Sequence, residues 1–144
     1  MTYYAVIDTN VLVSSMLKNI SIPGKVLDQI TNGTIIPLMH SNILSEYTQV
    51  LSRSKFNFPT YKIDGMLKDI LSHAIFVDTD NIEELKEILP DPKDVVFYEV
   101  VMEARKEHDA YLVTGNIKHF PFKTFIVTPR EMLDIINQSN EGTD

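Results

Sequence analysis

Three acidic residues, Asp8, Glu46 and Asp94, stand where a carboxylate could do chemistry. Asp8 directly follows the apolar run Tyr3–Ile7, and ligands of α/β sheets bind beyond the carboxyl ends of the strands. Glu46 borders the apolar face of one predicted helix, and Asp94 stands at the mouth of another. Because the formal net charge is −7, we consider that some carboxylates hold a cation, whose own charge would reverse the local field.

Each of these acids also has a purely structural explanation. Asp8 or Asn10 could cap the helix that follows, and Glu46 could be a solvated side chain on its helix. Asp91 fits a helix cap, and Asp94 at the third position would then favour the helix dipole. The net charge is explained equally well by solubility, since proteins that bind nucleic acid through basic patches usually carry the opposite sign.

A second polar group follows the predicted strand Tyr111–Val113. Gly115 is expected to let the chain turn sharply there. If this strand lies beside the first one, Thr114 and Asn116 face the carboxyl edge of the sheet near Asp8; an ordinary strand-to-loop turn explains the same residues without a function. Two weaker candidates for contacts with a substrate follow closely: Lys118 and His119.

Strand-like and helix-like segments alternate along the chain. Short apolar runs predict strands at residues 3–7, 35–39, 75–77, 111–113 and 125–127. Apolar residues at helical spacing predict helices at residues 11–17, 21–32, 41–51, 60–73, 91–104 and 128–136, with Ser21, Ser41 and Thr128 as caps. The alternation implies a mostly parallel sheet covered on both faces, which is a three-layer α/β sandwich.

Length and composition are those of one ordinary globular domain. The 144 residues are 44% hydrophobic and 23% charged, which suffices for one core and not for two. The absence of cysteine excludes disulfides and thiolate zinc sites. We find no secretory signal and no apolar run near the roughly 20 residues that span a bilayer, so a cytoplasmic location without membrane contact is expected. We predict one domain over residues 1–137 and a polar, disordered tail over residues 138–144.

Taken together and in this order, these features resemble the PIN-domain family of metal-dependent ribonucleases. The likeness is greatest to the toxin components of toxin–antitoxin pairs, the VapC-like ribonucleases. It covers residues 3–133 and is most specific over residues 6–10 and 91–120. The matching features, in chain order, are the strand before Asp8-Thr9-Asn10, then Ser41 and Glu46 on a helix, Asp94 and Phe97 on another, and Leu112-Val113-Thr114-Gly115-Asn116 followed by Phe120.

The resemblance implies that Asp8, Glu46 and Asp94 bind Mg²⁺ or Mn²⁺ and that Thr114 steadies the site, with Asn10 and Ser41 as further supporting residues. A fourth acid commonly follows the Thr-Gly pair in this family, but here Asn116 takes its place. Asparagine keeps an oxygen ligand and loses the charge. This departure weakens the case for tight binding of a second metal.

Hard carboxylate oxygens suit Mg²⁺ and Mn²⁺. Such a metal lowers the pKa of its water and neutralises charge that develops on a phosphate, so no protein nucleophile is needed. The expected reaction is in-line hydrolysis of a phosphodiester, and RNA as the substrate comes from the family likeness alone. The likeness also implies a cognate antitoxin as a partner, and a homodimer is a further expectation.

Two other functions compete with this prediction. A PIN-like domain with a weakened site could act as an RNA-binding or scaffold module, and Asn116 favours that alternative. One segment resembles the nucleophile motif of haloacid-dehalogenase-type phosphatases. It is the apolar run of residues 75–77 followed by Asp78-Thr79-Asp80. That family needs a lysine and an acidic pair further along, and too little sequence follows Asp80.

Overall fold

A central parallel sheet organises the computed structural model, which describes all residues except 19, 80–88 and 142–144. The strands of the described part form one five-stranded sheet in the order β3-β2-β1-β4-β5, and each neighbouring pair is parallel. The strands are β1 Tyr3–Ile7, β2 Ile35–Met39, β3 Ile75–Phe76, β4 Tyr111–Val113 and β5 Ile126–Val127. The predicted mostly parallel sheet is therefore confirmed.

The strand order places a switch point between β1 and β4. From β1 the chain builds outward to β2 and β3, and then returns to add β4 and β5 on the other side of β1. β1 and β4 are in register, with Ile7 opposite Val113, and the Asp8 N–H donates to the Val113 carbonyl at 2.9 Å. Because crevices for ligands form where the order reverses, the residues that follow these two strands share the natural site of this fold.

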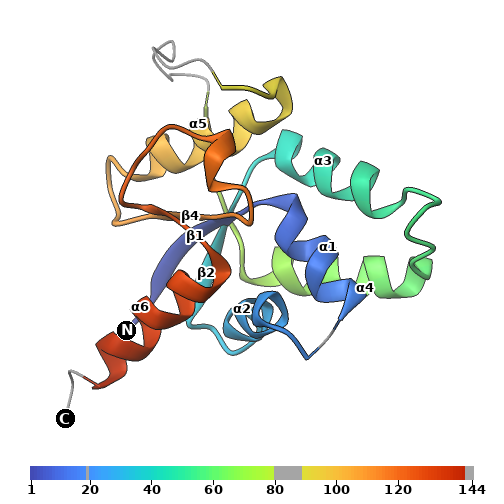
Figure 1. Ribbon diagram of the computed structural model, residues 1–144, viewed down its shortest axis with the longest axis horizontal. Coiled ribbons are helices and arrows are strands. Elements are labelled where there is room, and N and C mark those ends of the chain that lie inside the picture. The colour runs from blue at the N-terminus through green and yellow to red at the C-terminus, as the bar shows by residue number, and fades with distance from the viewer. Residues whose placement is uncertain (19, 80–88, 142–144) are drawn as a thin grey trace.

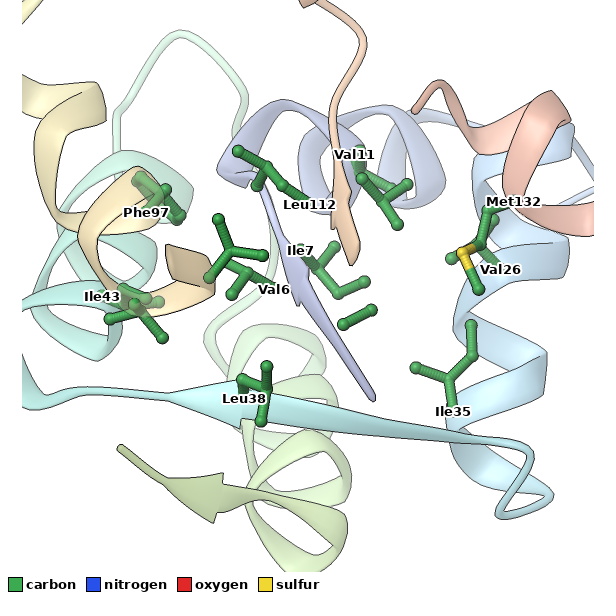
Figure 2. Close-up of a cluster of buried hydrophobic side chains, with 14 of the residues drawn as sticks. Val6, Ile7, Val11, Val26, Ile35, Leu38, Ile43, Phe97, Leu112 and Met132 are labelled. Carbon is green, nitrogen blue, oxygen red and sulfur yellow. The ribbon is translucent and has the colours of Figure 1, made fainter. Parts of the chain in front are cut away.

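Helices cover both faces of the sheet (Figure 1). Figure 2 shows Phe97 and Ile43 on one side of β1, and Val26 and Met132 on the other. Outside residues 19, 80–88 and 142–144, the α-helices are α1 Thr9–Leu17, α2 Ile22–Thr31, α3 Ser41–Leu51, α4 Thr60–His73, α5 Val95–Ala104 and α6 Pro129–Glu141, and the short 3-10 helices are η1 Pro92–Asp94 and η2 Ile117–His119. The architecture is the predicted three-layer α/β sandwich.

β1 is apolar along its length because it is covered on both faces. Ala5 and Val6 are fully buried, and Ile7 is buried as well. A strand covered on both faces reads as a continuous apolar run rather than as an alternation. The buried run ends at Asp8, which makes the carboxylate the first polar side chain beyond the core.

The helix starts at Ser21 and Thr128 are confirmed. The Ser21 hydroxyl accepts from the Gly24 N–H at 3.1 Å. Thr128 and Glu131 form a reciprocal capping box, with hydrogen bonds of 2.9 and 3.1 Å. α6 continues to Glu141, into the range predicted as a tail, while residues 142–144 lie outside the described part.

Two other predicted helix starts were wrong. α1 begins at Thr9 rather than at residue 11, because Asp8 already has the extended backbone of an N-cap. α3 is capped by His40 and not by Ser41: the His40 ring accepts from the Asn42 N–H at 3.0 Å, and Ser41 is the first helical residue. A histidine is not among the preferred caps, so the serine next to it was the natural choice from sequence.

The edge strand β3 is exposed rather than buried. Ile75 and Phe76 are 43% and 58% exposed, since β3 pairs with β2 alone in the described sheet. In the part of the chain that the structure describes, no helix is long and apolar enough to cross a membrane.

Candidate active site

Asp8 is a buried carboxylate held in one orientation by its neighbours. Its side chain is 6% exposed. The Thr114 hydroxyl donates to Asp8 Oδ2 at 2.8 Å, and the Asn10 side-chain amide donates to the same oxygen at 3.3 Å. The Asp8 side chain makes no capping hydrogen bond to α1. Asp8 thus occupies the N-cap position of α1 through its backbone, while its carboxylate contacts Thr114 and Asn10.

The turn after β4 locks onto the start of α1. The Thr114 hydroxyl accepts from the Asn116 N–H at 2.9 Å, so it bridges Asp8 and the turn. The Gly115 N–H donates to Asn10 Oδ1 at 3.1 Å. Gly115 does not have a positive φ, which means that the expected need for glycine flexibility was wrong. The turn is held by these side-chain hydrogen bonds instead.

Asp94 lies close enough to Asp8 for its charge to act on that carboxyl group. It lies at the junction of η1 and α5, with no capping hydrogen bond from its side chain. Asp91 is the cap, since its carboxylate accepts from the Lys93 N–H at 2.9 Å. The Asp94 carboxylate lies 3.3 Å from the His119 ring. Asp94 therefore has contacts across the crevice that a helix start does not require.

The pKa values of both aspartates are raised, and the charge of Asp94 contributes to the shift of Asp8. Burial is the main cause that raises the pKa of Asp8 to about 6; the hydrogen bond from Thr114 opposes this rise, and the negative charge of Asp94 contributes to it. Burial also raises the pKa of Asp94, with additional repulsion from Asp91 and, least of all, from Glu46, while His119 opposes these effects. The crevice thus holds negative charge that the protein alone only partly neutralises.

Glu46 is the more distant member of the predicted trio. It is half-buried on α3 and repels Asp94, but it is not among the groups that shift the pKa of Asp8. Among the described residues, no three acidic or imidazole side chains are already arranged to hold a metal ion. The charge of Asp94 therefore acts on Asp8, and the charge of Glu46 acts on Asp94.

Of the four supporting residues predicted from the sequence, two contact the Asp8 carboxylate through their side chains and two do not. Asn10 and Thr114 contact Asp8 directly. The Asn116 backbone N–H donates to the Thr114 hydroxyl, and Asn116 itself is exposed. Ser41 is exposed in a groove that it shares with Leu44 and Phe76, and no contact joins it to the carboxylates.

The model of a known protein family, the PIN domain, matches residues 4–118. The chain belongs to the PIN-domain family. No curated protein and no solved structure matches the chain. PIN domains are generally nucleases that use divalent metal ions, so the family supports hydrolysis of nucleic acid here. The match includes β3 and Asp78, which assigns that segment to a PIN domain rather than to a phosphatase; Asp80 lies outside the described residues.

The donor groups of this PIN domain fit a hard divalent cation. Asp8 and Asp94 supply carboxylate oxygens, the ligand type that Mg²⁺ and Mn²⁺ prefer. Both side-chain hydrogen bonds to Asp8 are accepted by Oδ2, so the second oxygen accepts no hydrogen bond from a side chain of the described residues. A cation would also relieve the repulsion that helps to raise both pKa values.

Tyr47 is a supporting residue that the sequence did not reveal. It is fully buried on α3, next to Glu46, and its hydroxyl donates to the Ile7 carbonyl just before Asp8. Burial raises the pKa of Tyr47 far above its usual range, and the charge of Asp8 adds to this. A tyrosine on an otherwise aliphatic helix face was the only signal, since a buried hydroxyl needs a partner.

Proposed function

We propose that this PIN domain is a Mg²⁺- or Mn²⁺-dependent endoribonuclease in which Asp8 and Asp94 are the principal metal ligands and Glu46 completes the set. One observation carries the proposal. Asp8, which is 6% exposed, stands at the switch point of the sheet. Its carboxylate accepts two side-chain hydrogen bonds at one oxygen, and the negative charge of Asp94 acts on it. Burying two like charges together is costly unless a cation joins them.

The protein residues prepare the site for an anionic substrate. Thr114 and Asn10 fix the Asp8 carboxylate, so no reorganisation is needed when the substrate arrives. The His119 ring contacts the Asp94 carboxylate from the segment after β4. A bound divalent cation supplies an activated water and charge neutralisation at the phosphate.

Cleavage of a mixed RNA pool tests this function. We expect the purified protein to cleave RNA with Mn²⁺ and to lose this activity with a chelator. Asp8→Asn and Asp94→Asn should abolish cleavage while the protein stays folded, and Asp64→Asn, at an exposed position of α4, is the matched control. If Asp94→Asn leaves cleavage intact and only lowers stability, Asp94 is a residue of the helix start and not a ligand.

The toxin role rests on the family resemblance and on the net charge of −7, which suits a partner-controlled enzyme better than a free RNA-binding protein. We propose that a cognate antitoxin inhibits the domain in the cell. Expression of the domain alone should slow growth, and co-expression of the neighbouring gene should restore it. Harmless expression of an active nuclease would remove the toxin role and leave the enzyme standing.

An RNA-binding or scaffold module is the second candidate, because Asn116 supplies no charge where the family commonly has an acid. Under this alternative the protein would bind RNA without cleaving it, and Mn²⁺ would change neither binding nor stability. The same cleavage assay separates the two functions.

A further inference from the structure

A basic segment borders the acidic crevice. Residues 115–130 run from the turn after β4 to the first turn of α6 and include the orange loop in Figure 1. In a chain of net charge −7 this segment has no aspartate or glutamate, and its basic side chains are Lys118, Lys123 and Arg130. Its near end touches the site through His119, 3.3 Å from Asp94. An anionic chain that reaches the carboxylates would therefore meet local positive charge.

Phe122 projects from this segment into solvent. Its side chain is 92% exposed, whereas the chain on either side is anchored. Phe120 is 7% exposed in the core, and the Arg105 guanidinium lies 4.2 Å from the centre of the Phe125 ring. The backbone is thus held on both sides of a phenylalanine that the described fold does not bury.

The same segment also lines a cavity. It has a volume of about 340 Å³ and is lined by Gly115, Asn116, Ile117, Lys118, His119 and Thr128. The Asn116 amide can donate and accept hydrogen bonds, which suits the edge of a base, and the Lys118 ammonium suits a phosphate. The cavity shares Asn116 and His119 with the surroundings of Asp8 and Asp94.

We propose that residues 115–130 hold single-stranded RNA: Phe122 stacks on one base, the cavity takes up a neighbouring nucleotide, and Lys118 contacts a phosphate. This inference rests on the proposed function and adds the element that selects the substrate. An exposed ring can stack only on a base that is free of its own helix, because bases in a duplex are already stacked. The charge of the segment and its junction with the carboxylates favour RNA over a protein partner.

Tryptophan fluorescence tests the stacking directly. The chain has no tryptophan, so Phe122→Trp places a single reporter at this position. In the presence of a chelator, we expect a single-stranded oligouridylate to quench this fluorescence saturably and an RNA duplex to quench it much less. Tyr61→Trp is the matched control, because Tyr61 is 74% exposed on α4. Equal quenching of both variants by the oligouridylate would overturn the proposal.

Binding of a labelled oligouridylate to the otherwise unchanged protein gives a second measurement. Phe122→Ala should weaken binding about 5- to 150-fold, the range found when a base loses an aromatic partner, and Tyr61→Ala should have no effect. Lys118→Ala should lower the slope of log affinity against log salt by about 0.7.

The outcomes separate this proposal from the proposed function. If the wild-type protein cleaves RNA with Mn²⁺ and Phe122→Ala binds as well as the wild type, the inference is wrong and the ribonuclease stands. If the wild type cleaves no RNA but binds the oligouridylate through Phe122, the nuclease is wrong and the inference stands. A wild type that does not bind the oligouridylate at all overturns the inference as well.

Discussion

Replacing Asp8 with asparagine is expected to stabilise the metal-free protein at neutral pH. The carboxylate is 6% exposed and burial is the main reason for its raised pKa. Both side-chain hydrogen bonds to it are accepted by one oxygen, from Thr114 and from Asn10. The carbonyl oxygen of an asparagine in that place can accept both of these bonds, so the substitution removes the buried charge and keeps the two side-chain hydrogen bonds.

The size of the effect follows from the pKa of Asp8, which folding raises from 3.8 to about 6. Each pH unit of difference corresponds to about 1.4 kcal/mol, so the folded state loses roughly 3 kcal/mol when the pH rises through this range. A carboxyl group whose pKa is raised by folding contributes its stability below the unfolded value of 3.8 and loses it above about 6. The asparagine variant does not titrate and avoids this loss.

Urea denaturation of both proteins with a chelator present measures the difference. We expect Asp8→Asn to be more stable by roughly 3 kcal/mol near pH 8 and by little near pH 4. Near pH 8 the melting temperature should rise by about 6–12 °C, since 1 kcal/mol shifts a domain of about this size by roughly 2–4 °C. Asp64→Asn, at an exposed position, should show no such pH-dependent gain. An Asp8→Asn variant that is less stable than wild type at both pH values would refute the reasoning.

Three further predictions concern the metal and its surroundings. Mn²⁺ at about 100 times its Kd should stabilise the wild type by roughly 2.7 kcal/mol in thermal melts and leave Asp8→Asn unchanged; identical wild-type midpoints with Mn²⁺ and with chelator would count against a preformed site. Thr114→Val should cost about 1–3 kcal/mol in urea denaturation because it removes two hydrogen bonds, and it should weaken Mn²⁺ binding in calorimetry more than Thr114→Ser does. Asn116→Asp should tighten Mn²⁺ binding without RNA and retain cleavage, and Asn116→Ala should reduce activity less than Asp8→Asn; no gain in affinity from Asn116→Asp would mean that the side chain does not face the site.

The parts of the fold that depend on local pattern could be predicted from the sequence. β1 is a continuous apolar run that stops at Asp8, and this pattern alone gave the strand, its burial and the position of the acid at its end. The helix Thr60–His73 was predicted with its observed bounds because its apolar residues keep helical spacing throughout. Neither prediction requires knowledge of what packs against the element.

The contacts that complete the site could not be predicted, since they join elements far apart in the chain. The hydrogen bond from Tyr47 to Ile7 and the contact between His119 and Asp94 depend on which helix covers which side of β1. His40 took the capping place expected for Ser41 because a ring nitrogen that can accept is as useful there as a hydroxyl, and propensities record this only weakly.

The two sides of the candidate site differ in how firmly they are held. Asp8 is nearly buried and is fixed through Thr114 to the turn after β4, whereas Asp94 lies at a helix junction and Glu46 influences Asp94 alone. Since Asn116 adds no fourth charge, the Asp8 side supplies the rigid half of the site and the Asp94 side the adjustable half. A phosphate brought in along residues 115–130 would supply the missing anionic oxygens at the adjustable half. On this view, tight metal binding and correct substrate placement depend on each other, and the full site exists only when RNA is present.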